Sequence, residues 1–289
     1  MSTTTIERLG SYRLINVVNT GQTSRLYQAY DDEKREPVAI KTLLDRYAAD
    51  KEQIGLLQRE HAVAEKLSHP LLIGVREFDW NRSPRIPFLV MEWFAAPNVK
   101  AAINRGYESY AGDLEMIFSG MLASLMYLHE QGWVHRDVKP DNFLFHPEVG
   151  FKLIDFALAK RIPGGLAKLF SLKQKTQGTA SYMSPEQIRG LPSDPRSDIY
   201  GLGCTFFELL TGRVPYTATS MNELLQKHIS GAIPAVTAKN KNVTPEMGNL
   251  IRAMLAKKPD DRPKTIKELI GLLQGLRLFR RPPGAGDVV

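Results

Sequence analysis

The chain has 289 residues, of which 43% are hydrophobic and 24% are charged, so it can bury a sizeable core and lies near the length at which one core divides into two. Its single cysteine, Cys204, excludes an intrachain disulfide and a multi-cysteine metal site. The net charge of +7 is spread along the sequence. That distribution is typical of a solvated surface, although a basic balance is also compatible with binding nucleic acid, lipid or an anionic small molecule.

The N-terminal segment carries no secretory signal, and no apolar run is long enough to span a membrane. We therefore expect a soluble, cytoplasmic protein without a membrane anchor. Cys204 lies in an apolar run of helical period, which predicts a buried and inert thiol.

The first third of the chain is predicted to form strands around one helix. The helical segment spans 50–67 and ends before Pro70, because the residue preceding a proline disfavours the helical conformation. The strand-like runs, which alternate or are rich in β-branched residues, are 12–18, 24–30, 38–44, 72–80 and 88–94.

From residue 98 onwards the pattern favours helices, at 114–131, 197–212 and 265–276. The second of these is expected to start at a Ser or Asp cap, Ser197 or Asp198, and to end at a glycine. One apolar stripe marks the first of these helices, formed by Leu114, Ile117, Phe118, Met121, Leu122, Leu125 and Leu128.

Strands followed by helices indicate an α+β, two-lobed fold with its boundary near residue 95. The expected division is an N-terminal extension (1–11), an N-lobe (12–95), a C-lobe (96–277) and a disordered tail rich in Arg, Pro and Gly (278–289).

The segment HRDVKPDN (135–142) contains several polar and charged residues that are candidates for a catalytic or metal-binding site. Asp137 lies beside the cation Lys139, and Asn142 follows five residues after Asp137. Asp155 comes at the end of a short apolar strand. Carboxylate and amide oxygens are ligands that Mg²⁺ prefers, so Asn142 and Asp155 are candidate metal ligands. Either aspartate alone could equally cap a turn; the two together at this spacing favour a site.

These motifs resemble a protein kinase, and most closely the eukaryotic-like serine/threonine kinases of bacteria, over about residues 12–275. The resemblance implies a bilobal kinase fold: a small antiparallel-sheet N-lobe with one main helix, and a larger, mainly helical C-lobe. It also implies that ATP and Mg²⁺ are the cofactors.

The resemblance assigns roles to charged residues in the motifs. Lys41 of VAIK would hold the α- and β-phosphates, and Glu60 would pair with it. Asp137 would position the substrate hydroxyl and Lys139 would neutralise the transferring group. The other implied roles are Mg²⁺ ligation by Asn142 and Asp155, bonding of Thr179 to Asp137 and Lys139, pairing of Glu186 with Arg262, and bracing of the catalytic loop by Asp198.

The same resemblance implies an apolar adenine pocket and a hinge that offers backbone groups. Each of these residues taken singly is also compatible with an ordinary core position. The pocket residues are Val18, Leu26, Ala39, Met91 and Leu144, and the hinge residues are Glu92 and Trp93.

Two features depart from the family pattern. The family's phosphate-covering loop has glycines where this chain has Asn19, Gly21 and Ser24, so the segment is interpreted as a nucleotide loop with weakened cover rather than a bare hairpin. Ala157 replaces the glycine of Asp-Phe-Gly. Alanine fits there if φ is negative and costs about 1 kcal/mol or more if φ is positive.

The leading hypothesis is an ATP- and Mg²⁺-dependent kinase that phosphorylates Ser and Thr hydroxyls of proteins, including itself, with a transient homodimer as a possible arrangement for autophosphorylation. No nucleic-acid partner is expected. The alternative is a pseudokinase that acts as a binding or scaffolding module. Regulation is expected through Ser171 or Thr176, with Arg136 and Lys160 clamping the added phosphate.

Overall fold

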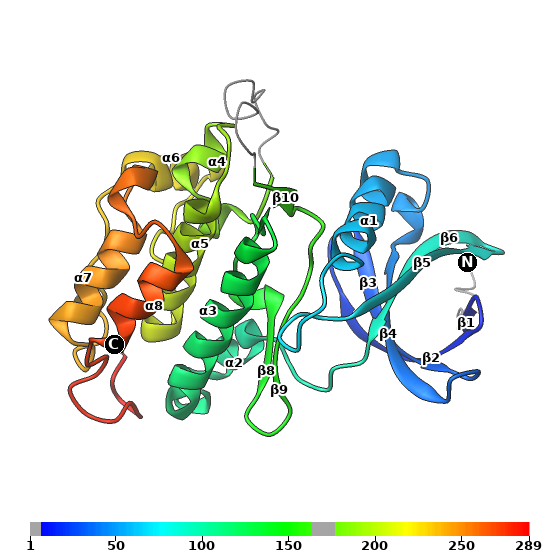
Figure 1. Cartoon of the computed structure of the whole chain (residues 1–289), viewed down its shortest axis with the longest axis horizontal. Helices are drawn as coiled ribbons and strands as arrows, with labels where there is room; N and C mark the ends of the chain where they lie inside the picture. The colour runs from blue at the N-terminus through cyan, green and yellow to red at the C-terminus, as the bar shows by residue number, and fades with distance from the viewer. Residues whose placement is uncertain (1–6, 163–176, 289) are drawn as a thin grey trace. The chain divides into compact units, whose positions relative to one another are not determined.

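The structure is a computed structural model that describes residues 7–162 and 177–288 (Figure 1). The chain forms two compact units. One comprises Met1–Ala95 with Ile154–Ala157, and the other comprises Ala96–Leu153 with Leu158–Val289. The first unit is mainly sheet and the second mainly helix, which agrees with the predicted α+β class.

The first unit contains an antiparallel sheet in the order β1-β2-β3-β4-β6-β5 and the helix α1 (Lys51–Ala64). Asp50 caps α1 by accepting hydrogen bonds from the N–H groups of Glu52 and Gln53. The strands are β1 (Arg8–Leu9), β2 (Tyr12–Thr20), β3 (Ser24–Asp31), β4 (Glu36–Leu43), β5 (Val75–Arg82) and β6 (Arg85–Glu92).

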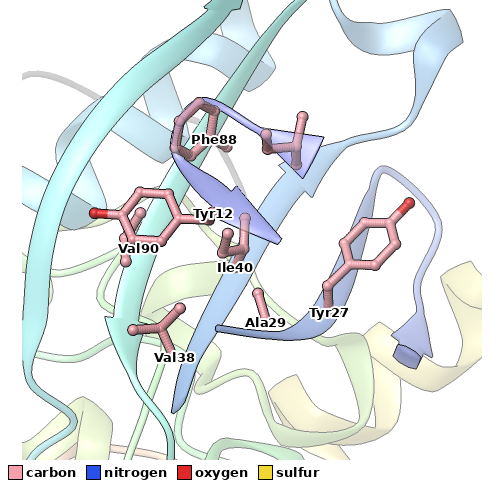
Figure 2. Packing of buried hydrophobic residues seen from close by; sticks show 8 residues of the cluster. Tyr12, Tyr27, Ala29, Val38, Ile40, Phe88 and Val90 are labelled. Carbon is pink, nitrogen blue, oxygen red and sulfur yellow. The ribbon is translucent and has the colours of Figure 1, made fainter. Parts of the chain in front are cut away.

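One face of this sheet forms an apolar core (Figure 2). Strand side chains alternate between faces, so pairs two residues apart, such as Val38 and Ile40, enter the same core. The Tyr12 ring meets Phe88 edge to face at 6.3 Å between centroids. By the same alternation Ala39 and Lys41 belong to the opposite face, so the core fixes the strand that presents the lysine.

The second unit is built around two long helices, α3 (Leu114–Glu130) and α5 (Pro195–Thr211). All seven residues of the predicted stripe on α3 are buried. The other α-helices and strands in the described part of this unit are α2 (Val99–Arg105), α4 (Pro185–Ile188), α6 (Met221–Ser230), α7 (Pro245–Met254), α8 (Ile266–Gln274), β7 (Trp133–Val134), β8 (Phe143–His146), β9 (Gly150–Leu153) and β10 (Lys160–Arg161).

Helix α5 begins earlier than the sequence pattern predicts. Its cap is Asp194, followed by Pro195 at the first helical position, and not Ser197 or Asp198. The carboxylate of Asp198 therefore lies inside the first turn and is available for other contacts. The helix ends at Gly212 in a left-handed conformation, as expected, and Cys204 within it is fully buried, which raises the pKa of its thiol.

The C-terminal segment differs from the disordered tail that we expected. Phe279 and Asp287 are buried, and Val243 and Asn240 form isolated bridges to Phe279 and Val288 respectively. Asn242 donates to a carboxylate oxygen of Asp287 at 2.9 Å. The segment is thus anchored by polar partners about forty residues earlier in the chain. In the described part of the chain we find no helix with the length and apolarity needed to cross a membrane.

Candidate active site

Three charged side chains meet in the first unit. Lys41 Nζ on β4 lies 2.7 Å from Glu60 Oε2 on α1 and 3.4 Å from Asp155 Oδ2. Burial opposes the charge of Lys41, but the carboxylates of Asp155 and Glu60 outweigh it and raise the pKa of this lysine. Burial raises the pKa of Glu60 to about 7, although the ion pair with Lys41 acts to lower it. The structure therefore holds a directed ammonium group between two carboxylates.

Asp155 adopts a left-handed backbone conformation, with φ of 65°, which aspartate tolerates better than most residues. Its carboxylate accepts a hydrogen bond from the N–H of Ala157 at 3.3 Å. Ala157 is not among the described non-glycine residues with positive φ. The alanine that replaces the family's glycine therefore does not bear the energetic cost of a left-handed backbone conformation.

Strand pairing places two of the candidate adenine residues of the first unit opposite each other. Ala39 is paired with Met91, and Leu26 with both Asn19 and Lys41. Glu92 ends β6 and is fixed by Gly74, whose N–H donates to its carboxylate at 2.7 Å. Of the other candidates, Val18 is about half exposed on β2, Trp93 directly follows β6 and is half-buried, and Leu144 lies in the second unit on β8.

The predicted phosphate loop is the hairpin between β2 and β3. Gly21 donates to the carbonyl of Ser24 at 2.9 Å, which closes the turn. Asn19 and Ser24 lie in the flanking strands, and neither has a positive φ. The hairpin therefore forms without the two absent glycines.

A second cluster lies in the second unit, where the loop after β7 meets Thr179. Lys139 Nζ contacts Asp137 Oδ2 and Thr179 Oγ1, both at 2.6 Å. Thr179 donates from its backbone and its hydroxyl to Asp137 Oδ1 at 3.0 and 3.2 Å. Asn142 donates through Nδ2 to the carbonyl of Asp137 at 2.7 Å, so its amide oxygen is directed away from that carbonyl. These four residues, predicted from the sequence, are in contact.

Asp198 holds the start of this loop. Its two carboxylate oxygens accept the backbone N–H groups of His135 and Arg136, each at 2.8 Å, and His129 Nε2 lies 2.8 Å from Oδ2. The carboxylate is completely buried. Asp198 thus bonds to the backbone at the start of this loop from α5, and its bracing role stays a prediction.

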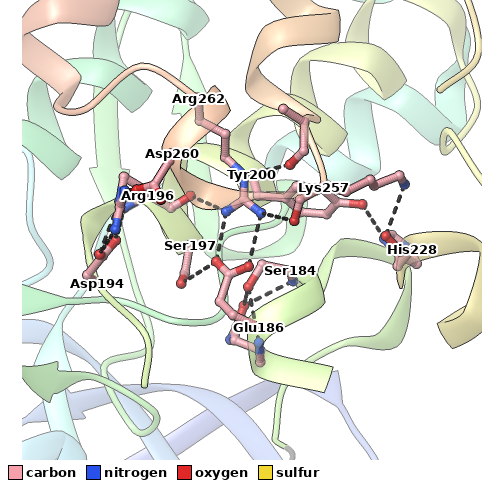
Figure 3. Close-up of polar contacts among 12 residues, drawn as sticks. Ser184, Glu186, Asp194, Arg196, Ser197, Tyr200, His228, Lys257, Asp260 and Arg262 are labelled. Carbon is pink, nitrogen blue, oxygen red and sulfur yellow. Dashed lines mark hydrogen bonds and ion pairs between the residues drawn. The ribbon is translucent and has the colours of Figure 1, made fainter. Parts of the chain in front are cut away.

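Glu186 and Arg262 form a buried bidentate ion pair, shown in Figure 3. Ser197 donates to Glu186 Oε1 at 2.7 Å, and Arg262 also donates to the carbonyl of Arg196 at 2.9 Å. Burial opposes the charge of Glu186, but the hydrogen bonds from Arg262 outweigh it and hold the pKa of this carboxyl below its usual range. The pair ties α4 to the segment before α8.

Residues 12–271 of the chain match the family model of the protein kinase domain. The chain belongs to the protein kinase domain family. The kinase domain is 31% identical over 262 residues to a probable serine/threonine-protein kinase of Streptomyces coelicolor, covering 90% of this chain and 39% of the relative.

Two further relatives show the same relationship. The domain is 31% identical over 245 residues to serine/threonine-protein kinase PknL of Mycobacterium tuberculosis, covering 85% of this chain and 60% of PknL. It is 30% identical over 260 residues to serine/threonine-protein kinase PrkC of Bacillus subtilis, covering 90% of this chain and 39% of PrkC. The chain thus spans between about two fifths and three fifths of the length of these relatives. They place the kinase domain with the eukaryotic-like bacterial type.

Only two of the four predicted regulatory residues of the kinase domain, Arg136 and Lys160, lie among the described residues. Ser171 and Thr176 lie outside the described residues. Arg136 is buried with φ of 70°, and its Nη1 lies 3.4 Å from the carbonyl of Leu158. Lys160 lies on β10, paired with Val134. The proposed phosphate clamp therefore stays a prediction.

Two side chains that support the kinase's catalytic loop were not predicted: His129, which contacts Asp198, and Gln187. Gln187 donates through Nε2 to the carbonyl of Arg136 at 2.8 Å. One local signal was available, because Ser184 and Gln187 have the spacing of a capping box and form one in the structure. No local pattern in the sequence shows that the amide reaches a carbonyl 51 residues away.

Proposed function

We propose that this kinase domain transfers the γ-phosphoryl group of ATP to serine and threonine hydroxyls of proteins in the presence of Mg²⁺. The observation that carries the proposal is the cluster of Asp137, Lys139 and Thr179, in which one carboxylate and one ammonium group are held within hydrogen-bond distance of each other. Phosphoryl transfer needs little covalent chemistry from the protein and depends on positioning and charge neutralisation.

In this proposal Asp137 orients the substrate hydroxyl and accepts its proton. Lys139 neutralises charge on the transferring group. Thr179 holds the Asp137 carboxylate in place through two hydrogen bonds, so that the carboxylate need not reorganise during the reaction. A carboxylate and an ammonium group kept 2.6 Å apart limit each other's movement.

Nucleotide binding is proposed to rest mainly on residues of the first unit. Lys41, directed by Glu60, would bind the α- and β-phosphates as a point charge. The apolar residues Ala39 and Met91, adjacent across β4 and β6, would contact adenine, together with Val18, Leu26 and Leu144. The backbone of Glu92 and Trp93 would bond the base.

The oxygen atoms of Asp155 and Asn142 are of the kinds that bind a magnesium ion. Asp155 offers a carboxylate and Asn142 an amide oxygen, both suited to Mg²⁺. The ion, when bound, would neutralise charge on the phosphates. Asp155 also accepts from Ala157, which restricts the direction of its carboxylate.

Further parts of the proposal come from the resemblance alone. We assign the kinase domain to residues 12–277, and we propose protein substrates and autophosphorylation through a transient homodimer. A cytoplasmic location is proposed separately, from the sequence pattern. The family comparisons do not support the alternative of a pseudokinase. The negative φ of Ala157 also removes one of the two features that favoured it.

The test is transfer of radiolabelled γ-phosphate from ATP to casein and to the protein itself, with Mg²⁺ present or chelated, followed by mapping of the phosphorylated residues. The proposal predicts Mg²⁺-dependent label on serine or threonine. Binding of ATP without any transfer under either condition would contradict the proposal and favour a binding module.

A further inference from the structure

The residue immediately before Asp137 has an unusual backbone conformation. Arg136 has φ of 70°, in the left-handed region, which is unfavourable for a residue with a Cβ atom and persists only where neighbouring groups hold it. Its N–H donates to Asp198 Oδ1 at 2.8 Å. One side of this strained residue is therefore fixed from α5.

The other side of Arg136 is fixed by Gln187 of α4. Gln187 Nε2 donates to the Arg136 carbonyl at 2.8 Å, and both residues are buried. A buried carbonyl that loses its donor bears the full cost of desolvation, so this contact favours one orientation of the peptide that links Arg136 to Asp137. The N–H and the carbonyl of the strained residue are thus held by two different elements.

The amide of Gln187 is itself held in one orientation. Its Oε1 accepts from the N–H of Ser184 at 3.1 Å and from the Ser184 hydroxyl at 2.9 Å. Because the amide group is planar, these bonds at Oε1 direct Nε2 to the opposite side, where the Arg136 carbonyl lies. The capping box of α4 thereby orients a donor for the catalytic loop.

The space around the same carbonyl is limited. A Cβ atom on Gly178, which has φ of 125°, would lie 3.4 Å from the Arg136 oxygen. Gly178 directly precedes Thr179, whose N–H and hydroxyl bond to Asp137. The contact of Gln187 therefore lies beside the bonds that hold the Asp137 carboxylate.

We propose that Gln187 is a positioning residue for phosphoryl transfer: its amide holds the Arg136–Asp137 peptide in the orientation that aims the Asp137 carboxylate at Lys139 and Thr179. The inference rests on the proposed function, since it assigns a role toward Asp137. Loss of the donor would allow the strained peptide to rotate, which would turn Asp137 away from the hydroxyl of the substrate. Nucleotide binding would be unaffected, because Gln187 acts on the catalytic loop alone.

The test compares Gln187→Glu and Gln187→Met, two variants of similar side-chain length that lack the amide donor, with the parent protein. Gln226→Glu is the matched control, because Gln226 is exposed on α6 and bonds only to the nearby Ser230 hydroxyl in the described contacts. The measurements are kcat and the KM for ATP with casein as substrate, the midpoint of thermal unfolding, and the ratio of variant to parent kcat between about pH 8 and about pH 6.

We expect both Gln187 variants to lose about ten-fold or more in kcat, with the KM for ATP unchanged. Gln187→Glu should recover part of that loss as the pH falls, because only the protonated carboxyl can donate to the Arg136 carbonyl. Arg136, Asp137 and Asp198 line the same space as Gln187, and Glu186, which precedes it in the chain, is paired with Arg262. Gln187→Met should show no such recovery.

Parental kcat in Gln187→Met, or an equal loss of kcat and ATP affinity with no difference in pH profile between the two variants, would overturn the inference. If a Gln187 variant does not fold, Ser184→Ala replaces it, since it removes the hydroxyl that bonds to Oε1 and loosens the orientation of the amide while leaving Nε2 in place. Unchanged kcat there would also overturn the inference. Inactivity of the parent and of Gln226→Glu would instead contradict the proposed function itself.

Discussion

Glu186 and Arg262 are joined by two hydrogen bonds, 2.7 Å from Nη1 to Oε1 and 2.9 Å from Nη2 to Oε2, although they lie 76 residues apart. The side chain of Arg262 is fully shielded from solvent and also bonds to three carbonyls: those of Arg196, Ala256 and Lys257. A buried ion pair with this many additional bonds is costly to break from one side. We therefore expect that removing one partner of the pair destabilises the second unit.

Arg262→Met should lower the free energy of unfolding by about 3 to 5 kcal/mol, because it leaves the Glu186 carboxylate buried without its counter-charge. Urea unfolding followed by circular dichroism measures the change. Arg252→Met, at an exposed position on α7, is the control and should change stability by less than about 0.5 kcal/mol. The double variant Glu186→Gln with Arg262→Met should recover part of the loss; a double variant less stable than Arg262→Met would contradict this account.

His228 should make the stability of the protein sensitive to acid. Burial lowers the pKa of this imidazole to about 4, helped by the positive charge of Lys257, and Tyr200 Oη lies 2.9 Å from its Nδ1. A group whose pKa is depressed in the folded state contributes stability above its unfolded pKa of about 6.5. That contribution is lost as the pH falls from about 6.5 towards 4, by up to about 3 kcal/mol.

The measurement is the unfolding free energy of the parent protein and of His228→Gln from pH 7.5 down to pH 4.5, values chosen to bracket about 6.5. We expect the parent's advantage over the variant to shrink as the pH falls. A difference that stays constant across this range would show that His228 does not titrate on unfolding.

Asp287 anchors the C-terminal segment and should be needed for full stability. Its buried carboxylate accepts from Asn242 and Gly284, each at 2.9 Å, and pairs with Arg281. Asp287→Ala should cost about 1 to 3 kcal/mol, since it leaves buried donors unsatisfied. Asp261→Ala, an exposed aspartate, is the control. Equal stability of the two variants in a urea titration would mean that the segment is not held by this carboxylate.

The hairpin of β2 and β3 gives a prediction about nucleotide affinity. The double variant Asn19→Gly with Ser24→Gly should bind ATP more tightly than the parent does, with a smaller gain for adenosine. The reason is that the loop is expected to contact the phosphates, which adenosine lacks. The gain should be about 1 kcal/mol or less, since flexible glycines cost order in the free protein. Calorimetric titration of both ligands with Mg²⁺ measures it. Equal changes for ATP and adenosine would show that the loop acts on the pocket as a whole.

The division into sheet and helical units could be predicted from the sequence because the periodicities are local: alternation marked the strands, and the α3 stripe is buried throughout. The contacts of Thr179 with Asp137 and Lys139 could be predicted because their motifs resemble those of a known family. The bond from Asn142 to the Asp137 carbonyl was not predicted, because Asn142 was considered only as a metal ligand.

What could not be predicted depends on partners distant in sequence. The composition of residues 278–289 is typical of a disordered tail, but Asn242 provides polar groups that bind Asp287 and the carbonyl of Arg281. Gln187 shows the same limit, since its capping-box spacing is visible locally and its contact with the Arg136 carbonyl is not. In α5 the cap Asp194 and the following Pro195 lie before the apolar run on which the predicted start of the helix was based.

The most direct test of the central claim measures ATP binding and γ-phosphoryl transfer on the same preparations of the parent, Asp137→Asn and the control Asp261→Asn. The account predicts that Asp137→Asn binds ATP with nearly parental affinity and loses transfer by about a hundred-fold or more, because Asp137 acts on the substrate hydroxyl and not on the nucleotide. Asp261→Asn should behave as the parent does. Retention of most of the turnover by Asp137→Asn would contradict the account.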